Sequence, residues 1–509
     1  MKPRFAWIAV TAAAVAALAV GQALAWLGPA AGATVRAATA AVTSTAQAVP
    51  LPLATGDQRS VRRPVLPHVC AILSAQLSTA TGQFATADET SPPDTARLQA
   101  ALRRCAGTHR AVELVAFRGD NSFLSGPVTI GNDETLVMQA GVTLYASRNP
   151  ADYQIPGNET CGTKGVLGNG CRPFITITGR DSGVMGTRGP AGSLGVIDGR
   201  GEMTILGSTQ TWWDVAESAH NGGAQNNPDL IVGQHADDVT IYQIELKNSP
   251  MYHIFMQDGT GLTVWGVMID TPAVGARNTD GIDPTSETDV TLNDDMIQDG
   301  DDCVAVKSFY PVPASNITVE NVHCYGTHGL SIGSQTGGNV TNVLFENDTV
   351  DGTDSLGNQS TDNNGIRIKA DAVNGGTTQQ VTYDDICETG IKHLLYFNTH
   401  YASGGTIIPS IQDVVVDGVV AVNSVHDAYS AFDGFDAQHP LQIDLENVSL
   451  DNTSQTESHT DQTDYTNAAR YNSNIVPSGT GVTIATLPAG GSIPACTFPA
   501  FGPPPAAAG

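Results

Sequence analysis

Short apolar runs separated by Gly, Asn and Asp follow one another along most of this chain. From Ser122 onward each run is only a few residues long, as over 123–130 and 135–138, and such β-prone runs between turn residues predict strands rather than helices. After Leu230 a weak repeat appears, because strand-like openings recur at Val239, Leu262, Val290, Ile317, Val343, Val381 and Val414, in steps of 23, 28, 27, 26, 38 and 33 residues. This period fits one coil of a right-handed parallel β-helix, an all-β solenoid, which is the fold that we expect.

Other repeat folds match the spacing less well. Leucine-rich repeats need a Leu/Asn consensus that is missing here, and propeller blades need about forty residues each with a recurring Trp-Asp signature. A β-sandwich is the weaker alternative. One amphipathic helix is predicted from Asp94 to Cys105, where apolar residues at helical spacing follow an N-cap candidate. We expect this N-terminal helix to cap an open end of the stacked strands, which would otherwise leave an edge unpaired.

The two ends of the chain differ from its middle. Residues 1–25 have the pattern of a signal peptide: Lys2 and Arg4, an apolar stretch over 5–20 and a small-residue cleavage site at 23–25. An uncleaved membrane anchor is the alternative, but residues 21–22 interrupt the apolar run below the usual spanning length. We therefore expect a secreted, extracellular protein with no membrane association after cleavage, an Ala/Thr-rich linker over 26–65, a β-helix domain over 66–496 and a Pro/Ala-rich tail over 497–509.

The eight cysteines form an even set, which in an exported chain could make four disulfides. Spacing suggests three pairs without fixing the connectivity: Cys70 with Cys105, Cys161 with Cys171 around a Gly/Asn-rich loop, and Cys303 with Cys324 one presumed repeat apart.

The formal net charge of −27 argues against nucleic acid as a partner. Cations are scarce after Arg118, yet five of them (Arg277, Lys307, Arg367, Lys369 and Lys392) fall within one stretch of the repeat region. This placement indicates a local anion site on an acidic body.

Four polar motifs lie on successive β segments of that stretch: Asn278-Thr279-Asp280, Gly300-Asp301-Asp302-Cys303, Gly326-Thr327-His328-Gly329 and Arg367-Ile368-Lys369. Equivalent positions on neighbouring coils lie about 4.8 Å apart, so these side chains can line one groove. The spacings are one coil each, except that Arg367 follows His328 by 39 residues. We expect an inserted loop over 351–364 to account for the excess.

Strand geometry adds two expectations. Arg367 and Lys369 should point the same way, with Ile368 turned into the core, and Asp301 and Asp302 can share the groove only if the backbone bends at Gly300. Each motif alone also has an ordinary explanation, as a turn or a solvated surface. Their order on consecutive coils favours a functional site.

Such a set suits glycoside hydrolysis. One protonated carboxyl can give its proton to the leaving oxygen while an ionised partner activates water, and crowded like charges raise one pKa so that an acid form survives. A nearby imidazolium would lower that pKa, and a cation pair would bind a substrate carboxylate. The sequence contains no phosphate loop, Ser-His-Asp set or metal-ligand cluster that competes, and we expect no metal and no cofactor.

These motifs resemble the polygalacturonase family of pectin-degrading glycoside hydrolases, whose signature runs Asn-Thr-Asp, Gly-x-Asp-Asp or Asp-Asp-Cys, Gly-x-His-Gly and Arg-Ile-Lys. The similarity spans roughly residues 90 to 450. Upstream of the four motifs, two more segments look like the family: Ile197-Asp198-Gly199-Arg200-Gly201 and Asn248-Ser249-Pro250-Met251-Tyr252-His253. The resemblance implies a parallel β-helix that hydrolyses α-1,4-galacturonosyl bonds with inversion.

The resemblance also implies a role for each motif residue. Asp301 would be the general acid, Asp280 and Asp302 would hold and deprotonate the attacking water, His328 would tune the acid, and Asn278, Arg367 and Lys369 would bind substrate. The family tyrosine one coil after Arg-Ile-Lys has no clear counterpart, and His393 and Tyr396 are both candidates.

Two other functions are compatible with such a solenoid. A pectate-lyase-like enzyme would use Ca²⁺ carboxylates and a basic residue for elimination, and a non-catalytic carbohydrate-binding solenoid should have lost at least one of the three acids. All three are present. The expected partner is a polysaccharide, polygalacturonate or pectin, bound by a monomer. The sequence leaves open endo or exo cleavage and the tolerance of methyl esters.

Overall fold

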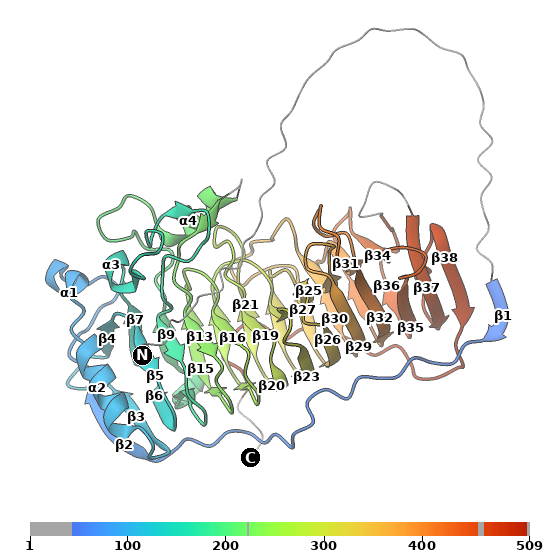
Figure 1. Ribbon diagram of the computed structural model, residues 1–509. Helices are drawn as coiled ribbons and strands as arrows, with labels where there is room; N and C mark the ends of the chain where they lie inside the picture. Colours follow the sequence, from blue (N-terminus) through green and yellow to red (C-terminus); the bar gives the residue numbers. More distant parts are fainter. Residues whose placement is uncertain (1–42, 221–222, 457–462, 506–509) are drawn as a thin grey trace, which may run out of the picture.

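The computed structural model describes residues 43–220, 223–456 and 463–505 as a long solenoid (Figure 1). Three parallel sheets run along its length, and each complete coil contributes one strand to each sheet, so that successive coils pair in register. The expected right-handed parallel β-helix is thereby confirmed. The signal peptide predicted over 1–25 lies outside the described residues.

The largest sheet has fifteen strands. In chain order they are β1 (Thr43–Gln47), β2 (Val69–Ser74), β3 (Arg110–Val115), β6 (Glu134–Met138), β10 (Gly183–Gly186), β14 (Thr240–Tyr242), β17 (Thr263–Trp265), β20 (Thr288–Asn293), β23 (Ala314–Glu320), β26 (Val340–Glu346), β29 (Gly376–Asp384), β32 (Pro409–Asp417), β35 (Leu441–Glu446), β37 (Thr463–Tyr471) and β38 (Thr480–Thr486). The seven openings found in the sequence repeat belong to seven consecutive strands of this sheet, β14 to β32.

The other two long sheets complete each coil. An eleven-stranded sheet contains β4 (Ser122–Ser125), β7 (Thr143–Ala146), β11 (Gly195–Asp198), β15 (Ile244–Lys247), β18 (Met268–Asp270), β21 (Met296–Gln298), β24 (His323–Tyr325), β27 (Thr349–Asp351), β30 (Cys387–Thr389), β33 (Val420–Val422) and β36 (Ser449–Leu450). A ten-stranded sheet contains β5 (Val128–Ile130), β9 (Ile175–Ile177), β13 (Ile231–Gln234), β16 (Ile254–Gln257), β19 (Ile282–Thr285), β22 (Val304–Ser308), β25 (Leu330–Thr336), β28 (Asn364–Lys369), β31 (His393–Asn398) and β34 (Tyr429–Asp433).

Aliphatic side chains stack in columns inside the solenoid. In the fifteen-stranded sheet one column runs through Val290, Ile317, Val343, Val381, Val414 and Ile443, which pair in register and are all buried. Burying one such side chain contributes about 1.5–3 kcal/mol, so the repeated column is a large part of what holds the coils together.

One corner of the solenoid explains the abundance of Gly, Asn and Asp. Between the fifteen-stranded and eleven-stranded sheets the chain turns through a single residue with positive φ in seven successive coils: Gly266, Asp294, Asn321, Asn347, Asp385, Gly418 and Asn447. Gly, Asn and Asp adopt this left-handed conformation at the least cost.

Helix α2 (Thr95–Cys105) closes the N-terminal end of the solenoid, as predicted. It buries Leu98, Ala101, Leu102 and Cys105 against the first coils. The structure adds three short helices that the sequence did not predict, α1 (Thr86–Thr90), α3 (Pro150–Tyr153) and α4 (Trp212–Ala219), and a 3₁₀ turn at Pro190–Gly192. Among the described residues, no helix is long and apolar enough to cross a membrane.

The segment before the first coil follows an unexpected course. Strand β1 pairs with β38 at the C-terminal end, and the chain then runs back along the whole solenoid to β2 (Figure 1). Backbone amides of this segment donate to outward-facing side chains on the way, with Leu51 bonded to Asp444, Ala54 to Thr382 and Gly56 to Asn342. The Ala/Thr-rich linker was expected over 26–65; its residues 26–42 lie outside the described residues, and the rest follows this course. The contacts are spread over distant coils, so they leave no periodic apolar pattern in the sequence.

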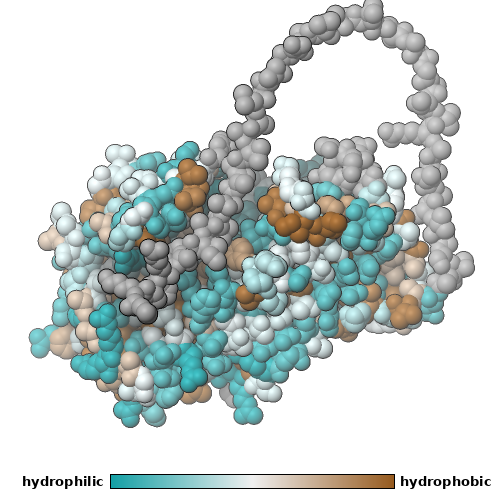
Figure 2. Space-filling model, in the orientation of Figure 1, coloured by the Kyte–Doolittle hydropathy of each residue, from teal (hydrophilic) through white to brown (hydrophobic). Residues whose placement is uncertain are grey.

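The C-terminal segment also returns along the solenoid, in the stretch where a Pro/Ala-rich tail was expected. The Cys387–Cys496 disulfide fixes its start, the Tyr325 hydroxyl donates to the Pro499 carbonyl at 2.8 Å, and Phe501 packs edge-on against Tyr325. The three cysteine pairs suggested by spacing are also bonded, so all eight cysteines form disulfides. The face seen in Figure 2 is mostly hydrophilic, with separate hydrophobic patches, as an inward-facing apolar pattern requires.

Candidate active site

A cavity of about 630 Å³ opens on the ten-stranded sheet and on the loops that lead into its strands. It is lined by all seven residues singled out in the sequence: Asn278, Asp280, Asp301, Asp302, His328, Arg367 and Lys369. They come from β28 and from the loops that precede β19, β22 and β25.

Strand register places these residues together. Ile282 pairs with Val304, and Val304 pairs with Leu330. Asp280, Asp302 and His328 each lie two residues before one of these, at the same corner of three consecutive coils. Arg367 pairs with Ser331 on the preceding coil, and Ile368 is buried in the core as expected. The long spacing before Arg367 is a loop over 352–363, between β27 and β28.

Gly300 is required by a close backbone approach. A Cβ atom at this position would lie 2.1 Å from the carbonyl oxygen of Ala276, so no other residue fits without a shift of the chain. The amide of Asp301 next donates to Asp299, and Asp301 and Asp302 both reach the cavity.

Asp301 forms an ion pair with His328. Its Oδ1 lies 3.0 Å from His328 Nδ1, and both side chains are largely buried. Burial alone would raise the pKa of Asp301, but the charge and hydrogen bond of His328 hold it well below its usual range. Burial lowers the pKa of His328, yet Asp301 outweighs it and raises that pKa. The Nε2 of His328 lies 3.1 Å from the Ser360 hydroxyl, in the inserted loop.

A short chain of amides orients Asp301 from its other side. The Asn278 side chain donates to Asp301 Oδ2 at 3.1 Å, and the Gln225 amide donates to Asn278 Oδ1 at 3.1 Å. Since Gln225 occupies the Asn278 oxygen, the amide nitrogen of Asn278 is left to face the carboxylate. Asn278 has a φ of 56°, a conformation that Asn tolerates better than most residues.

Asp302 is bound by both cations of the Arg-Ile-Lys strand. Lys369 Nζ donates to its Oδ2 at 2.8 Å, and Arg367 and the Ser331 hydroxyl donate to its Oδ1. Burial would raise the pKa of Asp302, but the two cations lower it. The sequence suggested that these two cations form an anion site. The structure shows that both are already paired with Asp302. Arg367 Nη1 also lies 3.7 Å from Asp362, which is half-exposed on the inserted loop.

Asp280 has one occupied and one open oxygen. Its Oδ2 accepts from Lys307 Nζ at 3.0 Å, while its buried Oδ1 has no partner among the described residues. Burial raises the pKa of Asp280 to about 6. The charges of Asp301 and Asp302 also raise this pKa, and the charge of Lys307 lowers it. The crowding expected to raise one carboxyl pKa therefore acts on Asp280 and not on Asp301.

Two tyrosines that the sequence analysis missed also line the cavity, Tyr252 and Tyr401. The Tyr401 ring centroid is 5.4 Å from Lys369 Nζ. The two candidates for the family tyrosine lie elsewhere: Tyr396 pairs with Arg367 in the sheet and stacks on His393, and neither contributes to the cavity lining. Tyr401 lies three residues after the end of β31, in the turn and not in the strand where the sequence analysis looked for the tyrosine.

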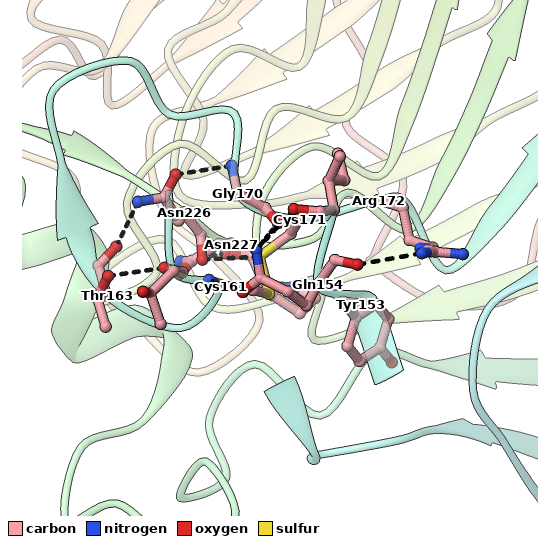
Figure 3. Close-up of a disulfide and its surroundings, with 12 residues drawn as sticks. Tyr153, Gln154, Cys161, Thr163, Gly170, Cys171, Arg172, Asn226 and Asn227 are labelled. Atoms are coloured by element: carbon pink, nitrogen blue, oxygen red, sulfur yellow. Dashed lines mark hydrogen bonds between the residues drawn. A yellow bond between two sulfur atoms is a disulfide. The ribbon is translucent and has the colours of Figure 1, made fainter. Parts of the chain in front are cut away.

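Two loops support the site, and one of them lines the cavity. The first is closed by the Cys161–Cys171 disulfide (Figure 3) and contributes none of the lining residues. Around it, the Cys161 backbone amide donates to Gln154 Oε1, and Asn226 bonds to Gly170 and Thr163. Its β8 (Lys164–Gly165) pairs with β12 (Ala224–Gln225), which presents Gln225 to Asn278. The second is the inserted loop, which contributes residues 359–362 to the lining.

One group of described residues has ligand atoms close enough to share a metal ion, since donor atoms of Asp301, Asp302 and His328 lie within 4.8 Å of one another. These donors are already engaged, because His328 bonds to Asp301 and both oxygens of Asp302 bond to Arg367 and Lys369. Protein cations occupy the positions in which a metal would neutralise the carboxylates.

Comparison with known proteins agrees with this geometry. A polygalacturonase of Ralstonia solanacearum is 35% identical over 444 residues, covering 77% of this chain and 80% of the relative. An endo-polygalacturonase of Pectobacterium carotovorum subsp. carotovorum is 33% identical over 400 residues, covering 77% of this chain and 90% of the relative. The solved polygalacturonase of Erwinia carotovora ssp. carotovora superposes with a TM-score of 0.69 at 30% identity, over 79% of this chain and 98% of that one.

The family model described as glycosyl hydrolases family 28 matches residues 126–470, which contain the ten-stranded sheet from β5 to β34 and every residue of the site. The chain therefore belongs to glycosyl hydrolase family 28.

Proposed function

We propose that this protein is a secreted polygalacturonase that hydrolyses α-1,4-galacturonosyl bonds of polygalacturonate and pectin with inversion. The observation that carries the proposal is the division of labour among the carboxylates of one cavity. Asp301 forms an ion pair with His328, Asp280 keeps an open oxygen, and Asp302 holds the two cations.

Asp301 acts as the general acid, together with His328. Below the raised pKa of His328 the pair carries one proton between the imidazole Nδ1 and the carboxylate Oδ1. For the reaction the proton moves from Nδ1 to the Asp301 carboxyl, which gives it to a glycosidic oxygen placed beside it as the bond from that oxygen to the anomeric carbon breaks. Asp301 is then a carboxylate and the imidazole is neutral, and solvent returns a proton to the imidazole before the next turnover.

Asp280 acts as the general base. Its Oδ1 can accept a hydrogen bond from a water, whose oxygen attacks the anomeric carbon while its proton passes to the carboxylate. Asp302 was expected to share this task, but its oxygens are already bound by Arg367, Lys369 and Ser331. Its role is to position the two cations.

The substrate carboxylate binds at Arg367 and Lys369. Each has donors in addition to those used on Asp302, and Tyr401 covers Lys369 at the edge of the cavity. An arriving galacturonate shares the cations with Asp302 and does not fill an empty site. The low dielectric of the buried site strengthens this contact relative to the repulsion from the acidic surface.

Two observations favour hydrolysis over the other functions. A Ca²⁺-dependent elimination would need carboxylates free to bind the ion, whereas Asp302 is saturated by protein cations. A non-catalytic solenoid would not need an acid–imidazole pair beside an unpartnered buried carboxylate oxygen.

Export is supported by four disulfides, which persist in oxidising compartments. We further propose that the enzyme acts as a monomer.

Asp301→Asn tests the assignment, because it removes the transferable proton and almost no volume. Release of reducing ends from polygalacturonate should fall at least about a thousandfold, consistent with the usual contribution of general acid catalysis, while oligogalacturonate binding and the melting temperature stay close to those of the unmodified enzyme. A kcat close to that of the unmodified enzyme would remove Asp301 from this role.

A further inference from the structure

Lys307 lies beneath the catalytic carboxylates and takes no part in the mechanism described above. It belongs to β22, opposite Thr285 of β19, and its side chain is only 8% exposed. Its ammonium donates to Asp280 Oδ2 at 3.0 Å and makes a second, shorter contact with Asp283 Oδ2. The Tyr252 ring centroid lies 4.8 Å from Nζ and closes a third side.

Each carboxylate of the site that is proposed to take part in the reaction has its own cation or cations. His328 pairs with Asp301, and Arg367 and Lys369 pair with Asp302. Among the described residues, Lys307 is the cation in ion-pair contact with Asp280. Removing it would leave the proposed base with no counter-charge.

The surroundings of Asp280 otherwise favour its neutral form. Burial is the largest cause, and carboxylates face it from neighbouring coils: Asp301 and Asp302 on the next coil, Asp299 on the loop leading to them, and Asp229 two coils earlier. Tyr252 lies between Asp229 and Asp280 along the same corner and is itself neutral, because burial raises its pKa far above the working range. A base with these neighbours remains ionised only with a fixed cation beside it.

We propose that Lys307 is a positioning residue that keeps Asp280 ionised and its open oxygen turned to the attacking water, with Asp283 as the second anchor of the ammonium. Asp283 is fully buried on β19, three residues after Asp280, so the two carboxylates hold the ammonium from both sides. This inference deepens the proposed function, since it concerns the base of that reaction.

The two partners of Lys307 give variants with opposite effects. Lys307→Met removes the cation, so the acid limb of the pH profile of kcat/KM should move upward by about one to three pH units. Asp283→Asn removes the competing carboxylate and leaves Lys307 to Asp280 alone, so the acid limb should move downward. A residue that only filled space would change stability or kcat at all pH values, without opposite displacements.

Lys307→Met leaves two buried carboxylates without a cation and could fail to fold. The double variant Lys307→Met/Asp283→Asn removes one charge of each sign and keeps the net charge of the site. The double variant is compared with Asp283→Asn, from which it differs only by the loss of Lys307, and its acid limb should lie above that of Asp283→Asn. An acid limb at the same pH in these two folded variants would overturn the proposal.

A second measurement separates this inference from the proposed reaction. Carboxyl carbons of ¹³C-labelled aspartate can be titrated by NMR in the free enzyme, with Asp280→Asn to assign the Asp280 signal. The Asp280 titration should lie at higher pH in the double variant than in Asp283→Asn. If it moves while the unmodified enzyme leaves polygalacturonate intact, the charge role of Lys307 stands and the proposed function fails. An unmoved titration overturns the inference whatever the substrate.

Discussion

Each carboxylate of the catalytic set is paired with different cations, and this pairing decides what each residue can do. Asp301 is matched by His328, Asp302 by Arg367 and Lys369, and Asp280 by Lys307. The sequence predicted which residues meet, because coil spacing places equivalent positions in one column. The sequence did not predict which carboxylate pairs with which cation, because that depends on side-chain rotamers and on the depth of each residue in the groove.

Lys369→Met should raise KM for polygalacturonate at least about tenfold, a loss of about 1.4 kcal/mol. The variant loses one of two donors to the substrate carboxylate, and Asp302 then competes for the remaining Arg367. Arg367→Met should do the same and also lower kcat, because the pair orients the sugar at the cleavage point. Lys247→Met is the matched control, since Lys247 lies on β15 of the eleven-stranded sheet, pairs with Glu245 and Asp270, and does not line the cavity.

Methyl-esterified pectin distinguishes the two explanations of these effects. It offers few carboxylates, so it should be a poor substrate for the unmodified enzyme, and both variants should discriminate against it much less. Initial rates on pectins of low and high esterification measure this ratio. Equal losses on both substrates would make Arg367 and Lys369 structural residues only.

At the scale of elements, the regular coils could be predicted and the additions to them could not. β14 to β32 follow from a repeat of β-prone openings, and α2 follows from apolar residues at helical spacing. Helix α4 was missed, although Thr211 and Asp214 form a capping box at its start. The strand β12 has only two residues, too few to show any period, yet it carries Gln225 to Asn278, which bonds to Asp301.

The disulfide loop over 161–171 is expected to act on catalysis more than on stability. Cys161→Ser/Cys171→Ser should lower kcat several-fold, because β8 and β12 lose the support that places Gln225 at Asn278. Cys70→Ser/Cys105→Ser is the matched control at the helix cap, away from the cavity. It should lower the melting temperature more, since it opens a sequence separation of 35 residues and not 10, and should leave kcat unchanged. The same loss of kcat in both double variants would contradict this role of the loop.

For the whole molecule, buried acids make stability depend on pH. Burial raises the pKa of Glu388 well above its usual value, and its carboxyl fills the space that a Cβ at Gly365 would occupy. Burial likewise raises the pKa of Asp295, Asp299 and Asp348. A carboxyl with a raised pKa in the folded state contributes stability below its unfolded pKa, near 4, and loses it as pH rises toward the folded value.

The melting temperature should therefore fall between pH 5 and pH 8. Glu388→Gln keeps the shape of the side chain and removes its titration, so its melting temperature should fall less over the same range. Each unit of difference between the folded and unfolded pKa of one carboxyl corresponds to about 1.4 kcal/mol in the free energy of unfolding. Thermal unfolding of both proteins across this range measures the difference, and identical slopes would mean that Glu388 does not contribute.

Both chain ends return along the solenoid, which ties its two ends together. β1 covers the edge strand β38, and residues after Cys496 lie against the eleven-stranded sheet near Tyr325. β1 is then the last strand of the sheet, and its length of five residues makes a short edge, which limits further pairing. Sequence patterning could not predict these paths, because contacts spread over many coils have no period.

The anomeric configuration of the first product tests the central claim most directly. In ¹H NMR of polygalacturonate digestion at the earliest times, the new reducing ends should appear as the β-anomer and only later equilibrate with the α-anomer, with Asp301→Asn as the inactive control. This result is expected because Asp280 delivers water from the face opposite to the bond that Asp301 protonates. Initial α-anomer, or an unsaturated product that absorbs in the ultraviolet, would contradict inverting hydrolysis at this site.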